Sequence, residues 1–221
     1  MSEGEANTTP TAARTERRLP VRKLGVMNRL GEVGVEGVAS RLERLGDRDG
    51  AEVRTEQVSI GFVDAASVDA TFPDEERVGI RVRLPGAPHG YVLVLFPMAS
   101  ANNAATLMLS DAVPDLSAVD NDLAHSALVE LGAMMAYGFM DAWADTFDQR
   151  IDVGTPRRVS GPVGTAVART VDREEDLGVY IASRLHLPRE DVDAEVLVLP
   201  SNETFVRLLD LLTIDQVTRE S

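Results

Sequence analysis

Residues 93–109 read LVLFPMASANNAATLML, and residues 196–212 read VLVLPSNETFVRLLDLL. In each stretch an apolar run is followed by a proline and then by a segment with the apolar spacing of a helix. Another run that ends in Leu-Pro precedes each stretch, at residues 84–85 and 187–188, and a long helical pattern precedes that run. The chain therefore contains an internal repeat with a period of about 100 residues.

The repeat predicts one α/β domain with pseudo-twofold symmetry, built from copies at about residues 21–110 and 120–213 and extending over residues 21–221. Two unrelated α+β lobes are the alternative. Residues 1–20 are polar and lack periodicity, which predicts a disordered N-terminal tail. Hydrophobic spacing predicts helices at 21–46, 64–72, 99–109, 120–147, 156–171 (interrupted near 161–162) and 201–212. It predicts strands at 52–62, 78–84, 91–96, 151–153, 179–187 and 192–199.

Charge and composition exclude several classes of function. The net charge of −14 argues against nucleic acid as the main partner, since phosphates must be met by positive charge. Lys23 is the sole lysine, and strong acidity with almost no lysine suggests an extreme-halophile cytoplasm or a GC-rich genome. The chain has no cysteine, and its three histidines lie far apart, so we expect no zinc site and no cofactor. Without an uninterrupted run of about 18 apolar residues, we expect a cytoplasmic protein with no membrane partner.

The second long helix carries the most informative motif, within HSALVELGAMMAYGFMDAWADTFDQRIDVGTPRRV at residues 125–159. Ser126, Glu130 and Ala133 share one helix face because they follow at steps of four and three. Glu130 is the sole charged residue between positions 122 and 141, so it is either a solvated helix residue or a residue with a specific partner. Trp143 is predicted to be a packing anchor whose indole N–H needs an acceptor.

Ser126, Glu130 and Pro156 match the signature Asp/Ser-x3-Glu-x2-Asn, followed by a proline, of the CheC/CheX/FliY family of chemotaxis phosphatases. Together with the repeat, the chain resembles an archaeal, haloarchaeal-type CheC over about residues 22–213. The resemblance implies a mainly antiparallel six-stranded sheet with two long helices on one face. It also implies a substrate, the acyl phosphate on an aspartate of the response regulator CheY, with Mg²⁺ held by that regulator. The family's Glu engages the regulator's lysine, and its Asn positions the attacking water.

This sequence departs from the family at both Asn positions, which are Ala133 in the second copy and Val35 in the first. Asn28 and Glu32 take the other places of the first motif, although Glu36 could replace Glu32 in a shifted register. The resemblance thus implies catalytic residues Glu130 and Glu32, and a partner-binding set of Ser126, Glu130, Ala133, Asn28, Glu32 and Pro156.

Without the amides, we expect a chemotaxis signalling protein that binds rather than catalyses, because alanine can neither donate to nor accept from water. Its expected partners are a CheY-type regulator, the receptor deamidase CheD and the archaellum switch proteins. The alternative is an active CheY-phosphate phosphatase that uses Glu130 or Glu32 with another amide, for which the candidates are Asn28, Asn102, Asn103 and Asn121. A small-molecule enzyme has little support, since Asp141 and Asp145 are best explained as a solvated helix end.

Overall fold

The computed structural model describes residues 21–43, 52–64, 66–72, 74–110, 121–170 and 178–212, so the predicted tail at 1–20 lies outside the described residues. Six strands form one antiparallel sheet in the order β1-β5-β6-β3-β2-β4. They are β1 Arg54–Val63, β2 Glu76–Leu84, β3 Gly90–Pro97, β4 Arg157–Pro162, β5 Gly178–Leu187 and β6 Val192–Pro200. The helices are α1 Val21–Leu42, α2 Val68–Thr71, α3 Met98–Leu109, α4 Asn121–Phe147, α5 Val163–Ala168 and α6 Asn202–Leu211.

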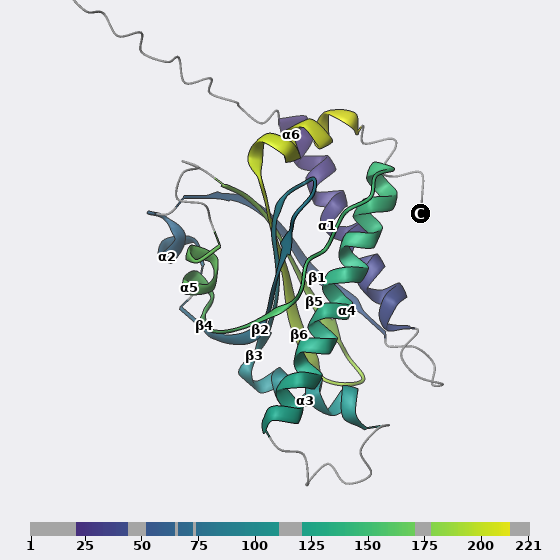
Figure 1. Ribbon diagram of the computed structural model, residues 1–221, viewed down its shortest axis with the longest axis vertical. Coiled ribbons are helices and arrows are strands. Elements are labelled where there is room, and N and C mark those ends of the chain that lie inside the picture. The colour runs from purple at the N-terminus through teal and green to yellow at the C-terminus, as the bar shows by residue number, and fades with distance from the viewer. Residues whose placement is uncertain are drawn as a thin grey trace, which may run out of the picture.

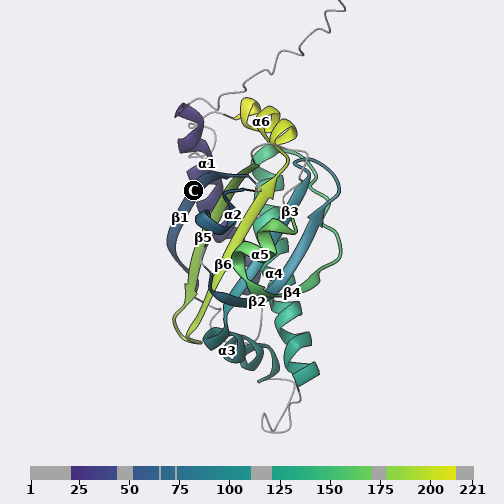
Figure 2. The same cartoon turned by 90° about the vertical axis from the view of Figure 1, so that its left-hand side faces the viewer.

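The two halves of the described chain follow the same order of elements: helix, strand, short helix, two strands, helix. The sheet order reads as a palindrome under this correspondence, with β3 and β6 paired at its centre and Leu93 opposite Leu197. Figure 1 shows the long helices α1 and α4 on one face of the sheet and the short helices α2 and α5 on the other. Figure 2 shows α3 and α6 at its two ends. Because helices cover both faces, the central strands can be apolar at nearly every position.

The pair α1 and α4 packs closely because three glycines lie at the contact. A Cβ added to Gly37 would lie 2.3 Å from the carbonyl oxygen of Gly138, and one added to Gly34 would overlap the Phe139 ring. Trp143 anchors the same interface: its Nε1 donates a hydrogen bond of 2.9 Å to the Leu30 carbonyl. The Trp143 ring also stacks on Phe205. The prediction of a buried anchor that needs an acceptor is confirmed.

Among the described helices, α4 is the one long and apolar enough to cross a membrane by length and composition. Its apolar side chains instead pack on the sheet and on α1, and Leu131, Met135 and Phe139 are fully buried in the core. Burial between a sheet and a second helix thus explains the composition of this helix.

The predictions for residues 151–171 were wrong in two places. Residues 151–153 are not a strand: the connector runs beside β2, where the Gly154 N–H donates to the Arg83 carbonyl at 2.8 Å. Residues 157–162 are not helical but form the edge strand β4, paired with residues 76–81 of β2. Gly161, at φ +117°, and Pro162 are the last two residues of this strand and α5 begins directly after them, which is why helical spacing holds only from residue 163.

Lys23 closes the C-terminal end of α6 against the start of α1. Its Nζ donates to the carbonyls of Leu209 and Leu212 and lies 3.5 Å from Asp210 Oδ1. The side chain is buried, so its ammonium takes the place of water at the C-terminal end of α6, where the Leu209 carbonyl also accepts from the Leu212 N–H.

Candidate functional site

In the first motif, on α1, the glutamate is bound by side chains of its own helix. Asn28 Nδ2 donates a hydrogen bond of 2.9 Å to Glu32 Oε1, and Arg29 Nη1 lies 3.2 Å from Glu32 Oε2. Both carboxylate oxygens of Glu32 therefore have a partner from the same helix. Arg29 also binds Glu36, with its Nη1 2.8 Å from Oε1.

Arg29 is a firm partner for both acids. Burial acts to lower the pKa of its guanidinium, but hydrogen bonds and charge interactions with Glu36 and Glu32 outweigh this and raise the pKa above its ordinary value. The sequence left open whether Glu32 or Glu36 occupies the motif. In the structure the two share one cation, and Glu32 is the one that also binds Asn28.

The second motif, on α4, has a different arrangement. Glu130 is exposed, and it makes no hydrogen bond or ion pair with any part of the chain that the structure describes. Ser126 does not reach it, because the Ser126 hydroxyl donates to the Asp122 carbonyl at 2.9 Å. The two copies of the motif thus present one neutralised and one unneutralised carboxylate.

The positions of the family's Asn are both inside the protein. Ala133 is 4% exposed and Val35 is 2% exposed, and both belong to the core beneath α1 and α4. Ala133 is predicted to share a partner-binding face with Ser126 and Glu130; in the structure it is buried, whereas Ser126 and Glu130 are exposed. A step of three residues turns a position about 60° from Glu130 around the helix, and here an apolar methyl at that position is covered by neighbouring chain.

Strand β4 brings Arg158 beside the start of α4, a placement that the sequence did not predict. The two terminal nitrogens of Arg158 lie 3.0 and 2.9 Å from the ring nitrogens of His125, one of which can accept a hydrogen bond from the guanidinium when the ring is neutral. Arg158 lies opposite Ile80 of β2, and Ile80 is also the residue against which Gly132 of α4 packs. The Pro-Arg-Arg sequence at residues 156–158 was the available signal, but it had been assigned to a helix. Half-buried Pro156 immediately precedes this strand.

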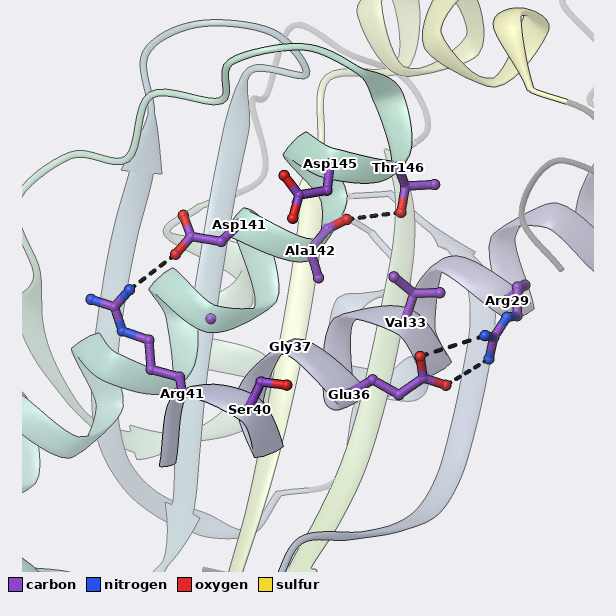
Figure 3. A pocket seen from close by; sticks show the side chains of 11 residues that line it. Arg29, Val33, Glu36, Gly37, Ser40, Arg41, Asp141, Ala142, Asp145 and Thr146 are labelled. Atoms are coloured by element: carbon purple, nitrogen blue, oxygen red, sulfur yellow. Dashed lines mark hydrogen bonds and ion pairs between the residues drawn. The ribbon is translucent and has the colours of Figure 1, made fainter. Parts of the chain in front are cut away.

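A groove runs between α1 and α4 over their glycine contact (Figure 3). Ion pairs stand on either side of it, Arg29 with Glu36 and Arg41 with Asp141, the latter at 3.0 Å. Asp145 is exposed on the same helix as Asp141. Asp141 therefore joins the two helices, whereas the sequence predicted only a solvated helix end.

The other candidate amides are dispersed. Asn103 on α3 donates to the Asp191 carbonyl at 2.9 Å, and Asn102 and Asn121 are exposed on α3 and at the start of α4. Of the four candidates, Asn28 is the one whose amide forms a hydrogen bond with a motif glutamate, Glu32.

Comparison with known proteins finds similar chains, although no family model matches this one. CheC1 of Halobacterium salinarum, provisionally named a CheY-P phosphatase, is 28% identical over 193 residues, which cover 87% of this chain and 97% of CheC1. FliY of Thermotoga maritima has the same fold, with a TM-score of 0.64 and 12% identity over 87% of this chain and 96% of the FliY chain. The chain is therefore similar to CheC1 in sequence and to FliY in fold.

A CheX structure from Desulfovibrio desulfuricans gives a TM-score of 0.54 at 13% identity, over 78% of this chain and 99% of that one. The six-stranded antiparallel sheet with two long helices on one face, which the resemblance to the CheC/CheX/FliY family implied, is confirmed. The likeness to a haloarchaeal CheC1 also agrees with the acidic, lysine-poor composition.

Proposed function

We propose that this protein is a CheC-like chemotaxis signalling protein that binds a CheY-type response regulator through the exposed face of α4 around Glu130. The likeness to CheC1, which is named for action on CheY-P, supports the class of partner. One observation carries the choice of site: Glu130 is an exposed carboxylate without a partner in the described chain, whereas Glu32 is held by Asn28 and Arg29.

The chemistry of Glu130 suits a cationic side chain on the partner. A carboxylate that binds nothing in the free protein gives up only water when it accepts an ammonium group, and the charged hydrogen bond it forms is stronger than a neutral one. Glu32 would first have to release Arg29 and Asn28. The second copy of the motif is therefore the one prepared to bind.

Phosphatase activity is weak or lost under this proposal. Hydrolysis of an acyl phosphate needs a water held in line with the phosphorus, which is a matter of positioning. The Ala133 methyl has no hydrogen-bonding group, and it is buried besides. Positioned groups of this kind contribute about 10²–10⁴-fold to a rate, so Glu130 alone should give recognition with little acceleration.

The alternative, an active phosphatase, is favoured by one contact: the amide of Asn28 lies beside Glu32. Asn28 precedes its glutamate by four residues rather than following it by three, and its Nδ2 is already engaged with Glu32. A regulator that displaced this bond would free the amide for a water molecule.

Two measurements with the same reagents separate the proposals. Binding is measured by calorimetry in molar KCl with a CheY-type regulator, with and without a phosphoryl mimic, and in parallel with CheD and archaellum switch proteins. Decay of the phosphorylated regulator is then followed with excess protein. We expect binding to the regulator and an unchanged decay rate. Accelerated decay that Asn28→Ala abolishes would establish the alternative, and absence of binding to every partner would refute both.

A further inference from the structure

Three metal-ligating side chains outside the motif face converge near the turn of the β5–β6 hairpin. Glu56 of β1, His186 of β5 and Asp193 of β6 each offer one ligand atom, and these atoms all lie within 4.8 Å of one another. We propose that they bind one divalent transition-metal ion. The proposal is independent of the proposed function, since none of the three residues belongs to either motif.

The fold sets this geometry through three adjacent strands. His186 and Asp193 are direct partners in the β5–β6 ladder, and His186 Nδ1 lies 2.7 Å from Asp193 Oδ1. On the other side, β1 has an irregularity between Thr55 and Gln57, where Glu56 is the extra residue. A bulge redirects a side chain that would otherwise follow the regular alternation, and here it brings the Glu56 carboxylate to the other two ligands.

The charge of the cluster also favours a bound cation. Arg54 on β1 is paired with Glu52 at 2.8 Å, and Arg184 on β5 lies 3.6 Å from Glu195. These arginines are therefore committed to acids outside the cluster. Within the described chain, Glu56 has neither a hydrogen bond nor an ion pair of its own. With His186 neutral, the cluster carries two negative charges, which a dication would balance.

The donor set indicates the class of metal. One imidazole nitrogen with two carboxylate oxygens suits Zn²⁺ and its first-row neighbours better than Mg²⁺ or Ca²⁺, which prefer oxygen alone. Three protein ligands on an exposed surface leave the remaining positions to water. The ion would join β1, the edge strand, to β5 and β6. Strand β1 also supports α1, because Val58 packs against Gly31.

The sequence predicted no metal site because spacing alone cannot show this one. Position 56 is far from 186 and 193 in the chain, and a seven-residue step between a histidine and an aspartate matches no metal motif. Only the sheet order, which places β1 next to β5, brings the first residue to the others.

The test titrates the full chain, freed of metal by a chelator, with ZnCl₂ at pH 7.5 in a calorimeter, and records its melting temperature. We expect one equivalent of Zn²⁺ and a higher melting temperature. Loss of a ligand should weaken binding at least about tenfold, since even loss of a supporting residue costs that much. His186→Gln and Glu56→Gln should therefore each weaken it, whereas His89→Gln, at an exposed histidine elsewhere, should not.

Circular dichroism of the metal-free variants checks that they fold. The proposal is overturned if folded His186→Gln and Glu56→Gln bind Zn²⁺ as the wild type does. It is also overturned if His89→Gln loses as much affinity as they do, or if the wild type binds no Zn²⁺. A pair of His186⁺ and Asp193 alone would give none of the metal-dependent stabilisation.

Discussion

Asn28 and Glu32 lie one helical turn apart on α1, and the amide of the first donates to the carboxylate of the second at 2.9 Å. The corresponding residues on α4, Ser126 and Glu130, make no such contact, because Ser126 bonds back to Asp122. The pseudo-twofold repeat thus presents the same motif in two states. The glutamate of the first copy is bound by its own helix, and the glutamate of the second has no partner in the described chain.

Release of Glu32 should create a second binding site. In the double variant Asn28→Ser, Arg29→Met, the Glu32 carboxylate loses both contacts from its own helix and, like that of Glu130, has no hydrogen-bond partner there. The stoichiometry of the CheY-type regulator, measured by calorimetry, should rise from one toward two per chain. A stoichiometry of one with unchanged affinity would show that the contacts of Asn28 and Arg29 are not what keeps Glu32 from binding the regulator. Arg77→Met, which removes a comparable charge from an ion pair on β2, is the control.

The glycine contact between the long helices should tolerate no side chain. Gly37→Ala places a methyl 2.3 Å from the Gly138 carbonyl oxygen, so the helices must separate. We expect a loss of about 1–3 kcal/mol in the free energy of unfolding, as in other overpacked cores. Gly86→Ala is the matched control, because its Cβ would meet only the Asp152 side chain at 3.7 Å. Equal urea midpoints for the two variants would contradict the packing described.

Trp143→Phe should destabilise the same interface by removing a donor rather than by adding bulk. The indole N–H bond to the Leu30 carbonyl is buried, and its loss, with the smaller ring, should cost about 1–3 kcal/mol. Urea unfolding followed by circular dichroism measures it. A variant within 0.5 kcal/mol of wild type, on the order of an ordinary surface change, would mean that the hydrogen bond contributes little.

The single lysine should be irreplaceable by an apolar chain of similar length. Lys23→Met keeps the stem but removes the ammonium donor from the carbonyls of Leu209 and Leu212 at the end of α6, which should cost about 1–3 kcal/mol. Hydrogen exchange should show the effect first in α6. If Lys23→Met unfolds at the wild-type urea concentration with unchanged exchange in α6, the cap is not stabilising.

The repeat, the central strands and the long helices could be read from the sequence because their apolar patterns are strong. At β3 and β6, burial on both faces produces the continuous apolar runs at residues 93–96 and 196–199. The edge strand β4 could not be predicted from the sequence. One edge of this strand faces water, and its sequence RRVSGP has little apolar pattern. The motif residues were found by resemblance, but their state depends on contacts that no spacing shows. Arg29 belongs to no motif, yet it decides whether Glu32 is available.

The net charge takes on a more specific meaning in the structure. Residues 101–150 carry −7 of the −14, yet the acids among them differ. Asp141 binds Arg41 across the helix pair, whereas Glu130 binds nothing in the described chain. In molar salt the Debye length is ~3 Å, so a partner must touch a carboxylate to sense it. Glu130 is placed for such a contact.

The most direct test of the account is the dissociation constant of the CheY-type regulator for three variants that each remove one negative charge. These are Glu130→Gln, Glu32→Gln and Asp145→Asn, the last an exposed acid farther along α4. The account predicts that Glu130→Gln weakens binding about tenfold or more, which is at least about 1.4 kcal/mol, and that the other two bind as the wild type does. Unchanged binding by Glu130→Gln, or an equal loss in Glu32→Gln, would contradict it.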